Sequence, residues 1–404
     1  MKKSFILALA LASLIGTAGF ADESYVTGGF EATGNVVAGA GWQRFKVKPV
    51  TAAVARDVNG TIPGPMGAYT TAAGVNKEDD FKFFVDQFEL DLAKSFGENI
   101  RVRGDFDFGG RTLNGGPRFN NASGAGIGSN VIVEQAYATA NLGLGNGVEF
   151  LLGRFNAPIG FEKVNIVKND TISRSELYRA LRPNTLTGAK FYYAFSDMVD
   201  WNVYIVNNAL NYENGGNTFY ANTDVPAFGT RLGFNWGDEG KKSTFGVSAV
   251  EGQDHANIKK HMSFLGDIDW QWWATDNFAF GGEALYRQID TTTAGTKNGK
   301  YYGALANLHY NFSDVWDGTL KYAYTKDVNG LVSAGVGVLP VTGAAAQSLT
   351  GAKQQIHEIT VAGNYSITDG AKLKLEGGYT YDKPTGTGNG QHIFGVAGAL
   401  AYEF

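Results

Sequence analysis

Apolar and polar residues alternate with a period of two through much of the chain. In the segment 100–108, Ile-Arg-Val-Arg-Gly-Asp-Phe-Asp-Phe, apolar side chains occupy one face and charged side chains the other. The same pattern recurs at 264–274 and at 278–288. Alternation of this kind is typical of β-strands that place one face in an apolar and the other in a polar environment.

The connections between such segments fall into two classes of length. Short clusters of turn-forming residues lie at 97–99, 143–147, 196–197, 237–240, 275–277, 313–317 and 368–370. Long polar stretches alternate with them at 43–80, 109–129, 156–188, 208–226, 251–262, 289–299, 327–354 and 382–391. This strict interleaving predicts antiparallel strands with all short turns at one end of the sheet and all long loops at the other.

We predict sixteen strands from this interleaving. Their expected bounds are 27–42, 82–95, 100–108, 130–142, 147–155, 188–196, 199–207, 227–236, 242–250, 263–274, 278–288, 300–312, 318–326, 355–366, 371–381 and 392–404. The segments 130–142 and 147–155 show no clean polar face. Connections sorted by length, an even strand number and about ten residues per strand are features of outer-membrane barrels. The predicted fold class is therefore all-β, a transmembrane antiparallel up-and-down β-barrel.

The energetic cost of exposing charge to lipid decides which face of each strand points inward. An Arg or Lys directed at lipid near the membrane midplane costs about 2–4 kcal/mol, so we expect the charged faces to line the lumen. The expected pore-lining residues are Arg101, Arg103, Asp105, Asp107, Asp267, Asp269, Glu283 and Arg287. A water-soluble barrel or solenoid with the same apolar residues inside is the alternative. Aromatic residues near both ends of the strands favour a membrane, because they match its two interfaces.

Both ends of the chain fit an exported barrel. Residues 1–21 combine a basic start, a short apolar stretch and small residues at Gly19 and Ala21, the two positions that a signal peptidase reads, which is the pattern of a signal peptide. We expect its removal to leave one barrel domain of residues 22–404. The chain ends on Phe404, an ending that resembles the C-terminal assembly signal of outer-membrane barrels.

Composition narrows the function classes further. The chain has 404 residues, no cysteine and a formal net charge of −5. A disulfide framework and a thiolate metal site are thereby excluded, and the mild acidic balance gives no reason to expect nucleic acid. After residue 21, no apolar run reaches the roughly 18 residues of a membrane-spanning helix. Because barrels of about sixteen strands leave an aqueous channel, the expected product is a pore.

One segment carries a family resemblance. It contains Gly153-Arg154-Phe155, Pro158, Gly160-Phe161-Glu162, Asn169, Ser173-Arg174-Ser175 and the run 182–188, Arg-Pro-Asn-Thr-Leu-Thr-Gly. These residues resemble the OmpL-like putative β-barrel porin family of bacterial outer membranes and, more distantly, the phosphate-selective type of porin. The resemblance implies passive diffusion of small hydrophilic solutes and ions through a channel set in outer-membrane lipid.

The third long loop, residues 156–188, is the candidate constriction of this pore. The resemblance to porins implies that it folds into the lumen, whereas the alternative is a surface loop whose arginines pair with its own acids. Besides Asp170 and Glu176, its charged residues are the expected constriction set, Glu162, Lys163, Lys168, Arg174, Arg179 and Arg182. Fields are focused at a narrow point. We therefore expect a weakly selective pore whose anion preference depends on Arg174, Arg179 and Arg182.

No catalytic or cofactor motif accompanies this organisation. His255 and His261 share a loop without a third ligand, and the zincin, nucleophile-elbow and phosphate-loop patterns do not occur. We expect no enzymatic activity, no cofactor and no metal. Three alternatives to a general pore remain: a barrel enzyme such as an outer-membrane lipase, which would need a nucleophile and a base together; an adhesin or structural barrel with a plugged lumen; and a solute-specific channel of the anion or phosphate type. Analogy with sixteen-stranded porins predicts a homotrimer.

Overall fold

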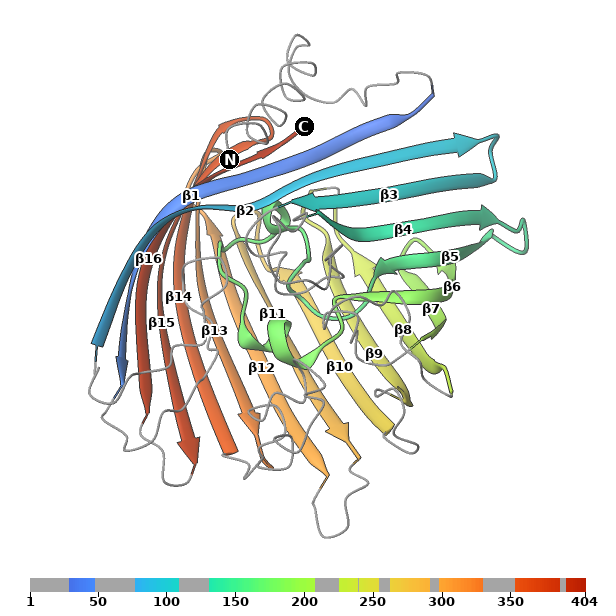
Figure 1. Ribbon diagram of the computed structural model, residues 1–404. Helices are drawn as coiled ribbons and strands as arrows, with labels where there is room; N and C mark the ends of the chain where they lie inside the picture. The colour runs from blue at the N-terminus through green and yellow to red at the C-terminus, as the bar shows by residue number, and fades with distance from the viewer. Residues whose placement is uncertain are drawn as a thin grey trace, which may run out of the picture.

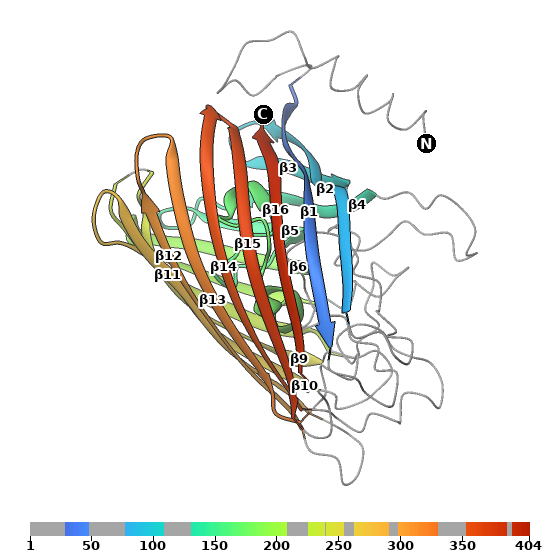
Figure 2. The same cartoon turned by 90° about the vertical axis from the view of Figure 1, so that its left-hand side faces the viewer.

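Sixteen antiparallel strands close into a barrel in the part of the chain that the structure describes (Figure 1). The structure is a computed structural model that describes residues 29–47, 77–108, 131–207, 225–238, 240–253, 262–290, 298–329, 353–385 and 390–404. Each strand pairs with its neighbours in sequence, and β1 pairs with β16. Figure 2 shows these two strands side by side. The predicted fold class is confirmed.

Most strand bounds lie within three residues of those expected from the sequence, but β1, β2 and β15 differ by four or five residues at one or both ends. The strands are β1 (Glu31–Val47), β2 (Lys77–Phe96), β3 (Ile100–Phe108), β4 (Val131–Asn141), β5 (Val148–Asn156), β6 (Thr185–Ser196), β7 (Val199–Val206), β8 (Ala227–Trp236), β9 (Ser243–Gln253), β10 (Met262–Trp273), β11 (Phe278–Ile289), β12 (Gly299–Asn311), β13 (Trp316–Asp327), β14 (Lys353–Thr368), β15 (Ala371–Thr385) and β16 (Gln391–Glu403). None of the described helices is long and apolar enough to cross a membrane. Residues 1–21, the expected signal peptide, lie outside the described residues.

Successive side chains of a strand point alternately into and out of the barrel. In β10, Asp267 and Asp269 are each 3% exposed, whereas Trp272 is 46% exposed. The charged face therefore lies inside and the aromatic face outside. This arrangement follows from the cost of placing charge in lipid.

Aromatic side chains form two bands on the outer surface. Trp316 packs against Tyr365 near the short turns, and Tyr286 packs against Tyr302 near the long loops. Two such bands mark the two interfaces of a membrane. The apolar positions between the bands face the hydrocarbon region.

Backbone hydrogen bonds join the two ends of the sheet. The N–H of Gly34 donates to the carbonyl of Phe404 at 2.8 Å, and the N–H of Phe404 donates to the carbonyl of Gly34 at 2.9 Å. The β1–β16 pairing then continues from Asn35 opposite Glu403 to Val47 opposite Gln391. Closure satisfies backbone groups that would otherwise be unpaired in lipid.

Two register shifts interrupt the alternation on one side of the barrel. The β1–β2 register shifts between Val37 and Ala38, which leaves Asp86 without an opposite residue. The β3–β4 register shifts after Asp105, which leaves Glu134 without one. Asp86 and Glu134 are both buried. In a regular strand two consecutive residues point to opposite faces, so each of these two or the residue next to it would point outward. Bulges re-aim side chains in this way.

The loop between β5 and β6, residues 157–184, lies within the barrel (Figure 1). It contains two short helical turns, η2 (Ile166–Lys168) and η3 (Leu177–Leu181). Its start and end are held together by the N–H of Ala157, which donates to the carbonyl of Asn184 at 2.9 Å. The loop ends earlier than expected, because β6 begins at Thr185, three residues before its expected start.

Candidate pore constriction

The first part of the loop is fixed to β10 and β11 through its backbone. The N–H of Gly160 donates to a carboxylate oxygen of Asp267 at 3.2 Å, and the N–H of Phe161 donates to Glu283 at 2.9 Å. Gly160 has a φ of 85°, and a Cβ there would clash with the Arg182 guanidinium. Glycine is the residue that adopts this conformation readily and leaves room for the arginine.

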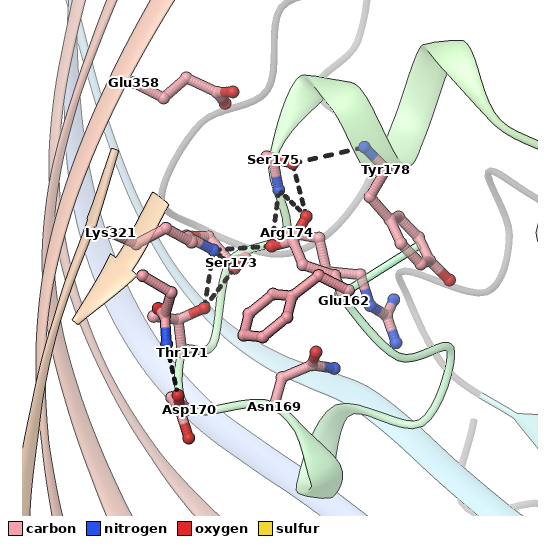
Figure 3. A network of polar contacts seen from close by, with 12 residues as sticks. Glu162, Asn169, Asp170, Thr171, Ser173, Arg174, Ser175, Tyr178, Lys321 and Glu358 are labelled. Atoms are coloured by element: carbon pink, nitrogen blue, oxygen red, sulfur yellow. Dashed lines mark hydrogen bonds and ion pairs between the residues drawn. The ribbon is translucent and has the colours of Figure 1, made fainter. Parts of the chain in front are cut away.

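A buried ion pair anchors the middle of the loop to β13. The Lys321 ammonium lies 2.8 Å from Glu162 and donates to the hydroxyl of Thr171 and the carbonyl of Ser173, each at 2.7 Å (Figure 3). The Glu162 and Lys321 side chains are 3% and 4% exposed. The same carboxylate accepts a hydrogen bond from the Ser175 N–H. Lys321 thus contacts two parts of the loop, one at Glu162 and one at Thr171 and Ser173.

The pKa of the Glu162 carboxyl reflects these contacts. Burial alone would raise it, but the charge of Lys321 and the hydrogen bonds from Lys321 and Ser175 hold the pKa below its ordinary value. Glu162 is therefore in its carboxylate form when it binds Lys321 and anchors the loop.

The loop next reaches the β16, β1 and β2 wall. The N–H of Ile166 donates to the side-chain oxygen of Gln87 at 2.8 Å, and the Lys374 ammonium donates to the Ile166 carbonyl at 3.3 Å. Lys168 forms an ion pair with Glu403, close to the short-turn end. Ile166 also packs among small apolar residues that include Val37. The loop therefore extends almost to the short-turn end of the barrel, where β1 begins and β16 ends.

The returning part of the loop follows β15, β14 and β12. The N–H of Ile172 donates to Glu376 at 2.6 Å, and the N–H of Glu176 donates to Glu358 at 2.8 Å. In η3, Leu177 packs so closely on Gly303 of β12 that any Cβ there would collide with it. Inward carboxylates accept loop amides, and a glycine makes space for a loop side chain.

The basic residues expected at the constriction have different environments. Arg182 is buried, donates to the carbonyls of Ile159 and Glu162, and stacks over the Tyr178 ring. Arg174 is partly exposed, donates to the Lys163 carbonyl at 3.1 Å and lies over the same ring, 4.7 Å from its centroid.

The remaining members of the expected constriction set also differ. Lys163 is exposed to solvent, yet the protein around it reduces its hydration and lowers its pKa below the ordinary value. Lys168 is occupied by Glu403, and Glu162 by Lys321. The side chain of Arg179 lies outside the described residues. Of the described bases of this set, Lys163 and Lys168 are exposed and Arg174 is partly exposed, whereas Arg182 is buried.

The eight expected pore-lining residues all occupy inward positions, but most are engaged. Asp267 and Glu283 bind loop amides, as shown above. Arg287 donates to the carbonyl of Leu181 at 3.3 Å, and Asp269 forms an ion pair with Arg231. Arg103 is bonded to Asp91 and Asp105, and Arg101 to Glu31.

The wall formed by β2, β3 and β4 is acidic. Carboxylate oxygens of Glu89, Asp107 and Glu134 lie within 4.8 Å of one another, and all three side chains are buried. Asn35 and Gln87 donate to Glu89, and Asn156 donates to Glu134. Glu89, Asp91 and Asp105 form a second described cluster of this kind, and the geometry of either could hold a cation. The sequence did not single out Glu134. Its position depends on the bulge, for which a regular alternation gives no signal.

Comparison with known proteins identifies the family. The sequence matches the family described as putative β-barrel porin-2, OmpL-like, over residues 67–404. The chain belongs to this porin family. No protein with a curated description matches the sequence.

Solved structures share its fold at low sequence identity. The outer membrane channel DcaP of Acinetobacter baumannii is 11% identical, with a TM-score of 0.59 over 96% of this chain and 100% of the other. The anion-selective porin from Comamonas acidovorans is 11% identical, with a TM-score of 0.56 over 93% of this chain and 99% of the other. OprB of Pseudomonas putida is 12% identical, with a TM-score of 0.54 over 93% and 94%. Family and fold together make this porin an outer-membrane channel for small solutes.

Proposed function

We propose that residues 157–184 form the constriction of a channel for passive diffusion of small hydrophilic solutes and ions. The supporting observation is the series of loop N–H groups bound by inward carboxylates of β10, β11, β14 and β15. Such contacts hold the loop along the inner wall, so that it narrows the lumen and leaves a path beside it. A channel of this kind needs no catalytic group or cofactor.

Charge at the narrow point gives a weak ion preference. Arg174 and Lys163 lie on the loop side, and Arg174 is close enough to Asp107 of β3 for electrostatic attraction. A solute therefore passes beside the bases on the loop, in the electric field of the acids buried in the β2–β4 wall. Because the acids retain partners and the bases are fewer than the loop sequence alone suggested, anion preference depends mainly on Arg174. A phosphate-type specific channel is the second reading, supported by the accessible Arg174 and Lys163.

Single-cysteine modification tests the constriction, because the chain has no cysteine of its own. Lys163→Cys should react with a charged, water-soluble thiol reagent and lose conductance in a planar bilayer. Arg44→Cys is the matched control, since Arg44 lies on the outer surface beside Trp42 and Asp79. Unchanged conductance of fully modified Lys163→Cys would show that the loop does not line the narrow point. Current block by phosphate but not by chloride would favour the specific channel.

Two further features of the mature protein belong to the same proposal. Removal of residues 1–21 is supported by their basic and apolar pattern, and N-terminal sequencing of outer-membrane protein tests it. Assembly into a homotrimer is supported by the fold, since OmpT of Vibrio cholerae, with a TM-score of 0.50, is described in a trimer form. Light scattering from the detergent-purified protein distinguishes one barrel from three.

A further inference from the structure

Three aromatic rings stack on the outer surface of β14, β15 and β16, near the long loops. The His357 and Tyr381 rings are 6.2 Å apart with an interplanar angle of 25°, and the Tyr381 and His392 rings are 4.7 Å apart at 23°. The stack follows directly from strand register, which places Tyr381 opposite both histidines. Tyr324 extends it onto β13.

Each imidazole in this stack is oriented by a tyrosine one row nearer the membrane centre. The hydroxyl of Tyr322 is 2.9 Å from Nδ1 of His357, and the hydroxyl of Tyr379 is 2.8 Å from Nδ1 of His392. When the phenol donates to Nδ1, a neutral imidazole carries its proton on Nε2. The Nε2 donor then points away from the tyrosine row. The same arrangement occurs twice, on either side of Tyr381.

Lysines lie next to the stack on the same outward face. Lys326 of β13 and Lys383 of β15 both pair with Gln355, two residues from His357 on β14. Lys46 of β1 pairs with His392. We call Lys46, Tyr322, Lys326, His357, Tyr379, Tyr381, Lys383 and His392 the Tyr–His–Lys surface.

Acidic groups near this surface are directed elsewhere. Asp327 and Asp382 alternate to the inside of the barrel and are buried. Asp79 is bonded to Arg44 in a bidentate pair. The Tyr–His–Lys surface is therefore a basic patch on a chain whose net charge is negative.

The depth of the surface places it at the external membrane interface. Tyr324, in the row of the stack, lies eight residues along β13 from Trp316 in the opposite aromatic band, or about 26 Å of strand. Strand tilt of about 35–45° reduces that distance to about 20 Å, which is within one row of residues of the roughly 25 Å height of the apolar band of an outer-membrane barrel. Rows nearer the centre are apolar, with Ile359, Val361 and Phe394 exposed outward.

The other side of the barrel shows that this composition is not common to the whole external band. At the corresponding end of β8, β9 and β10, the outward residues Phe228 and Phe264 flank Glu251. An aromatic band is enough to meet a membrane interface. Paired histidines and lysines add hydrogen-bond donors and positive charge that a purely aromatic band lacks.

We propose that the Tyr–His–Lys surface binds the phosphomonoester headgroup of a lipid in the external leaflet. The Nε2 donors of His357 and His392 and the ammonium groups of Lys326, Lys383 and Lys46 bind the phosphate oxygens. The acyl chains lie along the apolar outward rows of β14 and β16. Charge complementarity and membrane depth both favour a lipid over a soluble phosphate.

Competition between lipids tests the proposal. Purified, folded barrel is mixed in detergent with equimolar phosphatidic acid, phosphatidylglycerol and phosphatidylcholine, and bound lipids are counted by native mass spectrometry. Each lysine near an anionic headgroup contributes about fivefold in affinity. With three lysines, phosphatidic acid should therefore be retained over phosphatidylcholine by about a hundredfold, and over phosphatidylglycerol by a smaller factor. Equal retention of the two anionic lipids would overturn the proposal.

Paired variants locate the binding. Lys326→Gln with Lys383→Gln should lower retention of phosphatidic acid by about twentyfold. His357→Phe with His392→Phe keeps three stacked rings and removes both imidazole donors, and should lower it severalfold. Lys300→Gln with Tyr286→Phe, on β12 and β11, is the control and should retain the lipid. A shift in electrophoretic mobility on heating confirms that each variant is folded. Loss in the control equal to that in the surface variants would show that the surface is not the site.

Discussion

Inward charged groups have different partners on the two sides of the lumen. On the β10–β15 side the ladders are regular through the middle of the strands, and inward charged groups such as Glu283, Lys321 and Glu376 bind the loop. On the β2–β4 side two bulges interrupt the register, and Glu89, Asp107 and Glu134 gather against one another. The loop thus binds charged groups of the β10–β15 side, whereas Glu89, Asp107 and Glu134 of the β2–β4 side lie against one another.

This difference separates anchoring from selectivity. Charges on the β10–β15 side have specific loop partners, so their loss should change stability and loop position. On the β2–β4 side, Glu89, Asp107 and Glu134 have amide partners and repel one another, so their loss should change the field in the lumen. Variants on the two sides should therefore fall into distinct classes.

Loss of the central anchor should have the largest effect. Lys321→Met leaves Glu162 buried without its cation, and breaking a buried ion pair costs about 3–5 kcal/mol. The free energy of unfolding in urea should fall by this amount in lipid vesicles, and the loop should become sensitive to protease.

The control for this prediction is an exposed ion pair. Lys241 lies 3.2 Å from Asp276 in a short turn, with side chains 43% and 91% exposed. Lys241→Met should change stability by less than about 1 kcal/mol, as is usual for surface pairs. Equal losses in both variants would contradict the assignment of Lys321 as an anchor.

Two arginines of the loop should separate stability from ion preference. Arg182→Gln leaves the carbonyls of Ile159 and Glu162 without their buried donor, at a cost of about 1–3 kcal/mol. Arg174→Gln removes a partly exposed charge, so it should cost little stability but shift the reversal potential in a KCl gradient toward cations. A larger shift in ion preference for Arg182→Gln than for Arg174→Gln would contradict this assignment and place the selectivity role on Arg182.

The contrast between the walls also explains what the sequence could predict. On β10, β11 and β13 the period of two is unbroken, so inward Asp267, Glu283 and Lys321 follow from alternation and the cost of charge in lipid. On β2 and β4 the bulges turn Asp86 and Glu134 inward beside Gln87 and Gln135, and alternation cannot show this. The period of two predicts which residues of a regular strand point into the barrel, but it does not predict the bulges.

The loop was harder to predict than the strands for a related reason. Its five bases look alike in the sequence, but their environments depend on contacts with residues far along the chain. Arg182 lies 3.9 Å from Glu283 of β11, and Lys168 meets Glu403, 235 residues away. Only the closed barrel brings these partners together.

Neutralising the acidic wall should alter ion preference without weakening the barrel. Asp107→Asn with Glu134→Gln removes two adjacent buried carboxylates, so stability should stay equal or rise by about 1 kcal/mol. The reversal potential should move toward anions. Asp276→Asn, in an exposed turn, is the matched control and should change neither quantity. A loss of several kcal/mol would place these acids among the anchors and remove the distinction between the walls.

The smallest expected effect is the acid sensitivity of the loop anchor. The pKa of Glu162 is held below its ordinary value in the folded protein, because the charge and hydrogen bonds of Lys321, with those of Ser175, outweigh the effect of burial. A group with a lowered folded pKa stabilises the fold above its unfolded pKa, here about 4.3, and loses that contribution as the pH falls through the folded value. Conductance and protease resistance should therefore be constant from neutral pH to about pH 5 and change only in stronger acid. Glu162→Gln cannot titrate, so this acid transition should be absent or reduced in it. A transition of equal size in both proteins would assign the acid sensitivity to other groups.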